Sequence, residues 1–397
     1  MKRIAFFMQA NQHEWLGGLS YLRNLLKAVL ANPGRRIEPV LMVHPAMAQT
    51  DLSGFPAVEV IRTPLVMHRH PARLASRVVF DLCQRDITLE LLLRKHRIDA
   101  LSHAPAIGTR STVPSIGWIP DFQHIRMSEY FTQRERDERD RQYLRLTNGS
   151  HRLILSSNDA RQDFTSFAPH AIDKARVLHF VASPDSTAAA LTREHIASRF
   201  GIDRPYFHLP NQFWTHKNHA VVIEAVGLLR KQGVDSLVLA TGKASDHRDP
   251  QHYERLMARV KQLGIEDSFR ALGVVSLPEL QSLMLHALAL INPSNFEGWS
   301  TTVEESKSLG LPMILSDIPV HQEQAPDLGR FFKSGSAEAL AEAMRSAMRT
   351  HDPVLAKQAR KMAAQRLPER MVQFGRTYEA IALDAISNAA RPKDSRT

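Results

Sequence analysis

The hydrophobic positions of the chain form short apolar runs, separated by stretches in which apolar residues recur every three or four positions. Residues 2–8 make the first run, and leucines and valines at helical spacing follow it until Asn32-Pro33-Gly34 ends the pattern. Short apolar runs predict strands, and a 3.6-residue period predicts helices. The same alternation predicts strands at 37–43, 57–62, 98–102, 115–119, 152–156 and 176–180, with helices near 72–95 and 133–147.

The alternation starts again after a helical stretch that ends near residue 200. It predicts strands at 206–209, 236–241, 268–272, 288–292 and 312–316, and helices at 218–232, 250–263, 301–309 and 370–388. Another helix is predicted to begin at Ser276, because Ser276 and Glu279 have the spacing of a capping box. Repeated β-α-β units are typical of parallel sheets covered by helices on both faces.

The predicted fold class is therefore α/β, with two Rossmann-like doubly wound domains that face a central cleft. We place the first domain at 1–185 and the second at 200–368. The helix at 370–388 is expected to pack back on the first domain, and residues 391–397 are expected to be a disordered tail.

Composition narrows the class of protein. A chain of 397 residues is longer than one ordinary core uses, and 43% hydrophobic with 23% charged residues is typical of soluble globular proteins. The single cysteine, Cys83, can form neither an internal disulfide nor a thiolate metal cage, which indicates a reducing compartment. The apolar runs are too short for a membrane span or a signal peptide, so the sequence predicts a cytoplasmic protein.

The charge of the chain is uneven. Residues 1–200 hold 27 Lys and Arg against 19 Asp and Glu, an excess of 8, whereas the remainder holds 24 against 22, an excess of 2. A basic first half favours an anionic partner: nucleic acid, a membrane surface or an anionic small molecule.

Two segments of the second half carry candidate chemistry. The usual glycine-rich nucleotide motifs, metalloprotease and serine-hydrolase motifs, and a D-x-D metal pair are all absent from the sequence. Residues 292–305 pass from a strand end through a glycine loop into a helix, which places them where parallel sheets bind ligands. Glu297 and Glu305 can accept hydrogen bonds from paired sugar hydroxyls, while Gly298, Ser300 and Thr301 suit a phosphate at a helix N-terminus. Alternatively, Glu305 only favours the start of the helix.

Glu297-x7-Glu305, followed by a helix and by Gly310 and Pro312, resembles the E-x7-E motif of family 4 retaining glycosyltransferases, which have the GT-B fold. The resemblance implies that Glu297 contacts the donor sugar and Glu305 the ribose hydroxyls of the nucleotide. It further implies that the backbone around Gly298, Trp299, Ser300 and Thr301 faces the sugar and the diphosphate.

Residues 209–219 support this resemblance, because the family usually carries Gly-Arg-x4-Lys at this place. Lys217 matches the lysine, whereas Asn211 stands for the glycine and Gln212 for the arginine, as in a branch with an N-Q-F-W-x-H-K-N-H segment. Lys217 would neutralise the donor diphosphate, and His216 or a first-domain residue would compensate for the missing arginine. His216 and His219 could equally be core or capping histidines. Lys217 could equally be a solvated lysine at the start of a helix.

Further matches are weaker. The resemblance implies that Gly273 and Val274 contact the nucleobase, and that Gly17 and Gly18 form a turn beside the diphosphate before the first long helix. Pro120 stands where many family members have a histidine. The neighbouring candidates for contact with sugar or acceptor are therefore Asp121 and His124.

The expected function is metal-independent transfer, with retention of configuration, from a nucleoside-diphosphate sugar. The donor is GDP- or UDP-linked, with a preference for a GDP-sugar such as GDP-mannose, and no cofactor is expected. The acceptor is a glycan or a lipid-linked sugar of cell-envelope polysaccharide synthesis, including lipopolysaccharide. A nucleotide-sugar epimerase, a phosphorylase-like enzyme and an inactive scaffold subunit remain alternatives.

The charge excess then has another reading. Nucleic-acid binding would not explain the paired carboxylates, so we expect no nucleic-acid partner. The basic residues of the first half are either a solvated helix face or, as the alternative, a surface that contacts an anionic membrane peripherally. The ones to test are Arg69, Arg73, Arg77, Arg94, Lys95 and Arg97.

Overall fold

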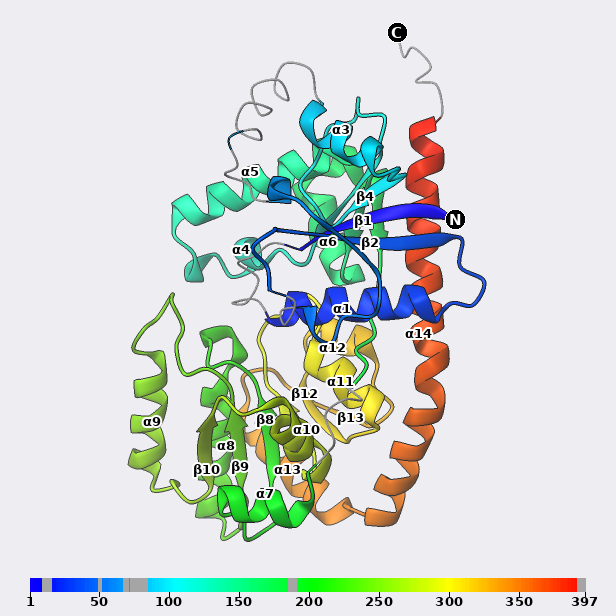
Figure 1. The fold of residues 1–397 in the computed structure, drawn as a ribbon. Coiled ribbons are helices and arrows are strands. Elements are labelled where there is room, and N and C mark those ends of the chain that lie inside the picture. Colours follow the sequence, from blue (N-terminus) through cyan, green and yellow to red (C-terminus); the bar gives the residue numbers. More distant parts are fainter. Residues whose placement is uncertain (9–15, 49–51, 67–70, 72–84, 185–190, 391–397) are drawn as a thin grey trace. The chain divides into compact units, whose positions relative to one another are not determined.

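The structure, a computed structural model, describes residues 1–8, 16–48, 52–66, 71, 85–184 and 191–390. The chain divides into two compact units (Figure 1). Unit 1 is Met1–Val181 with Pro368–Thr397, and unit 2 is Ala182–Leu367. Several predictions concern residues outside the described part: the tail at 391–397, most of the helix predicted at 72–95, and Cys83, Arg69, Arg73 and Arg77.

Unit 1 contains a seven-stranded sheet in the order β3-β2-β1-β4-β5-β6-β7, and each neighbouring pair is parallel. Its strands are β1 (Lys2–Met8), β2 (Ile37–Val43), β3 (Glu59–Arg62), β4 (Ala100–Ser102), β5 (Ser115–Ile119), β6 (Arg152–Leu155) and β7 (Ala175–Val177). Its helices include α1 (Leu16–Ala31), α3 (Ile87–Lys95), α4 (Gln123–Arg126), α5 (Gln133–Gly149) and α6 (Asn158–Phe167), with short 3-10 turns η3 (Pro64–Val66), η4 (Ser128–Tyr130) and η5 (Pro169–Lys174). The apolar run of β1 is buried almost completely, as expected for a central parallel strand.

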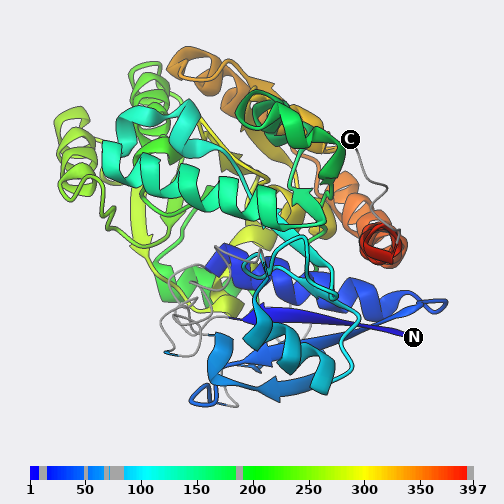
Figure 2. The ribbon, with the colours of Figure 1, turned by 90° about the horizontal axis from the view of Figure 1, so that it is seen from above.

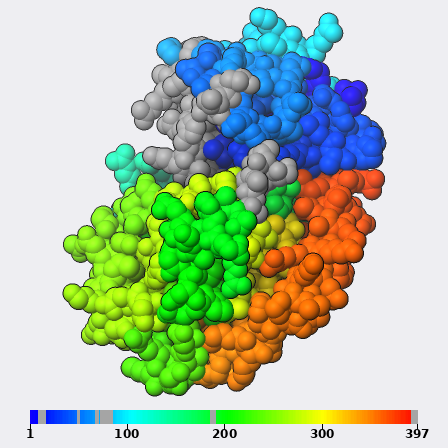
Figure 3. All heavy atoms as spheres, turned by 60° about the horizontal axis from the view of Figure 1, so that its bottom comes forward, coloured from blue at the N-terminus to red at the C-terminus, as the bar shows by residue number. Residues whose placement is uncertain are grey.

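Unit 2 contains a six-stranded parallel sheet in the order β10-β9-β8-β11-β12-β13. Its strands are β8 (Phe207–Pro210), β9 (Val238–Thr241), β10 (Phe269–Gly273), β11 (Leu290–Asn292), β12 (Met313–Ser316) and β13 (Gly329–Phe332). Its helices are α7 (Arg193–Phe200), η6 (Thr215–Lys217), α8 (His219–Lys231), α9 (His252–Leu263), α10 (Leu277–His286), α11 (Thr301–Leu309), α12 (Pro319–Gln324), α13 (Ala337–Thr350) and the first part of α14 (Pro353–Ala390). On one face, α7 lies at the surface of the unit (Figure 3), held by Ile196, which packs with Tyr206 and Leu239.

The strand order reverses between β8 and β11, which are hydrogen-bonded neighbours although three α-helices, one 3-10 helix and two strands separate them along the chain. Connections on either side of such a point run to opposite faces of the sheet. The loops that leave β8 and β11 therefore diverge and leave a place where ligands bind in doubly wound sheets.

The prediction of two parallel α/β sheets is confirmed. Most predicted strands lie within three residues of the observed ones, and the capping box at Ser276 and Glu279 has both of its hydrogen bonds. The prediction did not include α4, α6, α12, β13 and α13, and it began the last helix too late, because α14 continues through Pro368. A proline within a helix removes one backbone hydrogen bond and normally argues for a break.

The last part of α14 belongs to unit 1, where three kinds of contact hold it (Figures 1 and 2). Glu379 accepts hydrogen bonds from the backbone N–H of Arg36 at 2.8 Å and from its guanidinium at 3.2 Å. Asp384 pairs with Arg152 at 2.6 Å and Arg176 at 3.0 Å. Gly375 is buried at the backbone of α1, which leaves no space for a side chain.

Candidate functional site

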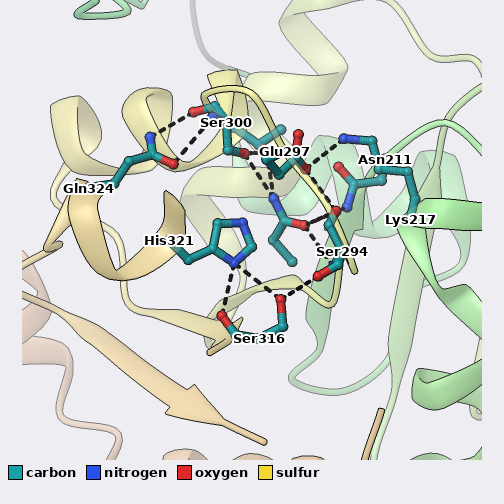
Figure 4. A network of polar contacts seen from close by, with 10 residues as sticks. Asn211, Lys217, Ser294, Glu297, Ser300, Ser316, His321 and Gln324 are labelled. Carbon is teal, nitrogen blue, oxygen red and sulfur yellow. Dashed lines mark hydrogen bonds and ion pairs between the residues drawn. The ribbon is translucent and has the colours of Figure 1, made fainter. Parts of the chain in front are cut away.

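The site of unit 2 is built from the two loops that leave β8 and β11. The amide of Asn211, after β8, donates to Asn292 Oδ1 at the end of β11 over 3.2 Å, and both side chains are buried. This bond ties the two predicted segments together at the strand reversal. Figure 4 shows the polar network that continues from it.

Lys217 and Glu297 form the ionic centre of this network. Lys217 Nζ lies 2.6 Å from Glu297 Oε1, and the two side chains are only 14% and 10% exposed. Burial by itself would raise the pKa of Glu297, but the neighbouring cation and the hydroxyl of Ser294 lower it to about 2. Glu297 is therefore an ionised, pre-positioned acceptor at neutral pH.

The loop from Asn292 to Ser300 is fixed by its own side chains. Asn292 donates to the hydroxyls of Ser300 at 2.9 Å and Thr302 at 3.3 Å, and its carbonyl oxygen accepts from Ser294. A fixed loop of this kind positions the carboxylate of Glu297 without relying on its long side chain alone.

Helix α12 holds the same loop from the other side. The Gln324 amide accepts the backbone N–H of Ser300 at 3.2 Å and donates to its carbonyl oxygen at 3.0 Å. Ser300 was predicted to offer this N–H to a ligand, and the structure corrects that prediction because the N–H is taken by Gln324. Glu304, 1% exposed, completes the clamp through Gln324 and Lys307.

Glu305 differs from its neighbour Glu304. It is half-buried in α11, and no charged or hydrogen-bonding group of the described residues lowers the energy of its charge. Burial raises the pKa of Glu305 to about 7. A carboxylate that lacks donors in this way gains most when a ligand supplies two hydroxyl groups.

The residues after β8 are also held in place. Gln212 Oε1 accepts the backbone N–H of Lys243 at 2.8 Å. Gln212 therefore ties this loop to the next one, and it brings no positive charge to the place where the family has an arginine. Asp246, 3% exposed, accepts the backbone N–H groups of Thr215 and Arg248 at 3.1 and 3.0 Å. The Arg248 guanidinium lies over the ring of Trp214, with its central carbon 5.7 Å from the ring centroid.

The histidines of this segment are not exposed ligands. His216 is 6% exposed, and burial lowers its pKa to about 3, so it carries no charge that could compensate for the missing arginine. His219 is fully buried and stacked on Phe213 at 4.2 Å between ring centroids. Both positions therefore favour the core interpretation that the sequence left open.

Other predicted donor residues lie at strand or helix ends of unit 2. Gly273 ends β10 in the left-handed region, with no atom within 4 Å of the place where a Cβ would be, and Val274 is 75% exposed. Trp299 is 9% exposed, while Gly298 and Thr301 are half-buried. Gly273 and Val274 thus present an open edge, whereas Trp299 belongs to the packed part of the loop.

The first-domain candidates all belong to unit 1. Gly17 and Gly18 lie in the first turn of α1 instead of in a turn before it. Asp121 accepts the backbone N–H of Gln123 at 2.9 Å and thereby shapes the end of β5. His124 is 1% exposed, bonded to Asp140 at 3.0 Å and packed edge-on against Tyr143. Its surroundings favour a structural role.

Two site residues were missed by the sequence reasoning: Asp246 and Gln324. Each accepts a backbone N–H from a segment distant in sequence, Asp246 from Thr215 and Gln324 from Ser300, so local patterns do not reveal them. The described residues contain no group of three or more His, Cys, Asp or Glu side chains that could hold a metal ion.

Comparison with known families gives a match in the same unit. Residues 193–366 match the family model described as "Glycosyl transferases group 1". A curated protein, mannosylfructose-phosphate synthase of Agrobacterium fabrum (strain C58 / ATCC 33970), is 26% identical over 127 residues, which are 32% of this chain and 28% of that protein. The match thus spans less than a third of this relative.

Solved structures match nearly the whole chain. A glycosyltransferase of Rickettsia africae ESF-5 has a TM-score of 0.70 and 16% identity, covering 98% of this chain and 99% of that one. Anabaena Alr3699/HepE, solved in complex with UDP-glucose, has a TM-score of 0.66 and 16% identity, covering 96% and 100%. WaaG, a glycosyltransferase involved in lipopolysaccharide biosynthesis, has a TM-score of 0.55 and 16% identity, covering 98% and 100%. At this identity they show the fold, which is GT-B.

Proposed function

We propose that this chain, whose residues 193–366 form a glycosyltransferase group 1 domain, transfers a sugar from a nucleoside-diphosphate sugar to an acceptor hydroxyl with retention of configuration. The observation that carries the proposal is the pairing of Lys217 with Glu297 at the strand reversal between β8 and β11. There a cation meets the acceptor predicted for the donor sugar, and Glu305 follows on the next helix.

The geometry supports a division of labour among these residues. The ammonium of Lys217 has three donors, of which Glu297 uses one, and it can turn to the diphosphate of a donor. Glu297 would accept hydroxyls of the transferred sugar, and Glu305 those of the ribose. Helix α11 begins at Thr301, so the positive end of its dipole lies at the same loop.

These groups suit the charge that develops during transfer. As the bond between sugar and phosphate breaks, positive charge grows on the anomeric carbon and negative charge on the leaving diphosphate. Lys217 and the α11 N-terminus would stabilise the leaving group more than the intact donor, which lowers the barrier. The acceptor hydroxyl can pass its proton to the leaving phosphate, so the proposal requires neither a metal nor a protein base.

We further propose that the donor is a GDP- or UDP-sugar and that the acceptor is a glycan or a lipid-linked sugar of the cell envelope. Among the similar solved structures, WaaG is described as involved in lipopolysaccharide biosynthesis, WaaB as a lipopolysaccharide outer core galactosyltransferase, and Alr3699/HepE was solved with UDP-glucose. These descriptions support the classes of donor and acceptor that we propose.

A thermal-shift panel with GDP, UDP, GDP-mannose and UDP-glucose tests the donor assignment. A ligand at 100 times its Kd should stabilise the protein by about 2.7 kcal/mol, which raises Tm by several degrees. No shift with any of the four would overturn the assignment. Release of a free or epimerised sugar without acceptor would favour the epimerase or phosphorylase alternative, and loss of transfer in Glu297→Ala would exclude the inactive scaffold.

The binding of nucleotide sugars should depend on pH through Glu305. Ribose hydroxyls bind the ionised carboxylate more strongly, and with a pKa of about 7 that form becomes dominant as pH rises. We expect the affinity of the wild type for UDP-glucose or GDP-mannose, divided by that of Glu305→Gln, to rise up to about tenfold from pH 6 to pH 8. The variant should bind more weakly than the wild type at pH 8. A ratio that does not change with pH would refute the ribose role.

The stability of the same variant provides a check that needs no ligand. Because the pKa of Glu305 is raised by folding, its protonated form contributes stability below about pH 4.5 that is lost as pH rises through about 7. Glu305→Gln should therefore be more stable than the wild type at pH 8, by roughly 1–3 kcal/mol, and similar to it near pH 4.

We also propose that α3 contacts an anionic membrane. Ile87 and Leu91 are 43% and 61% exposed on this helix, which ends with Arg94 and Lys95. Apolar and basic side chains on one short helix suit a peripheral surface, with each cation adding up to about 1 kcal/mol. No described helix is long and apolar enough to cross a membrane. Co-sedimentation with liposomes should increase with anionic lipid content and fall in Leu91→Glu; indifference to anionic lipid would remove the proposal.

A further inference from the structure

His321 has no assigned role in the proposed function, yet Ser316 and Ser294 connect it by hydrogen bonds to Glu297, the central carboxylate of that function. It belongs to α12, is 0% exposed, and its ring faces the 292–300 loop (Figure 4). The charged groups that act on its ring are Glu297 and Lys217. Of the charges that lower the pKa of Glu297, that of Lys217 comes first and the one that a protonated His321 would carry comes next.

The hydrogen bonds of His321 fix which nitrogen carries its proton. The hydroxyl of Ser316 donates to the carbonyl oxygen of Ser294 at 2.6 Å, so its own proton is used there. Both Ser316 oxygens then act as acceptors toward His321 Nδ1, at 3.0 Å for the carbonyl and 3.2 Å for the hydroxyl. Nδ1 must therefore be the protonated nitrogen, and Nε2 the basic one.

The Nε2 atom is buried and has no hydrogen-bond partner among the described residues. A buried acceptor that lacks a donor is costly, and here it lies near a carboxylate, which is also an acceptor. Burial lowers the pKa of His321, and the attraction of Glu297 opposes this effect. While Lys217 pairs with Glu297, one cation already balances the carboxylate, so the imidazole stays neutral.

We propose that His321 is the reserve cation of Glu297: when Lys217 turns from Glu297 to a donor diphosphate, Nε2 takes one proton from solvent and the imidazolium balances and holds the carboxylate. This inference rests on the proposed function. The exchange is balanced, since Lys217 keeps its charge, the ligand adds a diphosphate, and one proton enters. His321 is thus a positioning residue that acts through Glu297.

The rigidity of α12 suits this role. Gln324, three residues further along, is bonded to both backbone groups of Ser300, and its own carbonyl oxygen accepts from Lys307 at 2.6 Å. The imidazole therefore stays in place when a ligand binds, and only its protonation state can change. Such a residue keeps Glu297 ionised and oriented after its first partner has left.

Calorimetry in buffers of different ionisation enthalpy measures the protons exchanged on binding. UDP-glucose and GDP-mannose are suitable probes, because a diphosphate esterified at both ends does not titrate near pH 7. His321→Asn keeps a donor at the Nδ1 position for Ser316 but has no Nε2. Relative to the wild type, it should take up about 0.5–1 proton fewer per ligand and bind roughly tenfold more weakly.

Two further variants keep the result interpretable. Glu297→Gln removes the charge that makes His321 take up a proton, so it should lose the same uptake even if His321→Asn does not fold. His208→Asn replaces another fully buried histidine of unit 2, on β8, and should leave the proton count unchanged. The comparison with the wild type removes any constant contribution of Glu305.

The outcomes separate the two proposals. If neither nucleotide sugar binds the wild type, the proposed function fails, and this inference with it. If a nucleotide sugar binds and His321→Asn and Glu297→Gln exchange as many protons as the wild type, the reserve cation is wrong while the proposed function stands.

Discussion

Replacing Lys217 by methionine should lower the rate of sugar transfer by about 10²–10³-fold. In the proposed function the Lys217 ammonium meets the leaving diphosphate, and removal of one group aimed at developing charge has this order of effect. The loss should appear mainly in kcat, measured with the donor that the thermal-shift panel identifies, because the charge is larger in the transition state than in the bound donor.

The same variant should be less stable. With Lys217 absent, Glu297 remains in a site where it is 10% exposed and loses the largest of the charges that lower its pKa against the effect of burial. The pKa of about 2 in the wild type means stability that is present above about pH 4.5 and lost as pH falls toward 2. In Lys217→Met the free energy of unfolding at pH 7, measured with denaturant, should be lower by roughly 2–3 kcal/mol.

Two controls separate chemistry from stability. Lys217→Met with Glu297→Gln removes both charges and should recover most of the stability but none of the activity. Lys243→Met changes an exposed lysine that joins the site through its backbone N–H, so it should change neither. A Lys217→Met enzyme with transfer within threefold of the wild type would contradict the role of Lys217.

The sequence was most informative where function depends on local order. Lys217 and Glu297 follow neighbouring strands directly, and the strand-loop-helix context of each is visible in the pattern of apolar positions. Because the carboxyl ends of parallel strands share one edge of a sheet, two such segments could be predicted to lie at one place. Their pairing at 2.6 Å could not be predicted, because the pattern of apolar positions does not show which strands are neighbours in the sheet.

Three of the predicted site residues have a bonding partner that their own segment does not reveal. Ser300 looked like a free helix-start donor because Gln324, which takes its N–H, lies on another helix. His124 looked like a cleft residue because it follows a strand. In the structure Asp140 of α5 bonds to it, and Tyr143 of the same helix packs edge-on against its ring. Gln212 looked like a weakened phosphate site, and its bond to Lys243 shows what it does instead.

Gly375→Ala should destabilise unit 1 by about 3 kcal/mol, although alanine is the better helix former. In an exposed helix the substitution stabilises by about 1 kcal/mol. At Gly375 the new Cβ would press into the backbone of α1 at Ala28, closer than real Cβ atoms approach any neighbour. Backbone atoms cannot rotate away as a side chain can, so α14 must shift relative to α1 or the contact must open.

Whether Gly375→Ala lowers or raises the stability shows whether α14 packs closely on α1. Unfolding by heat should begin several degrees earlier in Gly375→Ala, and amides of α14 near Glu379 should exchange faster with solvent, because the same shift strains the bonds between Glu379 and Arg36. Gly34→Ala is the matched control, since no atom lies within 4 Å of its new Cβ and its stability should change by less than about 0.5 kcal/mol. A stabilised Gly375→Ala would mean that the close packing of α14 on α1 is absent in solution.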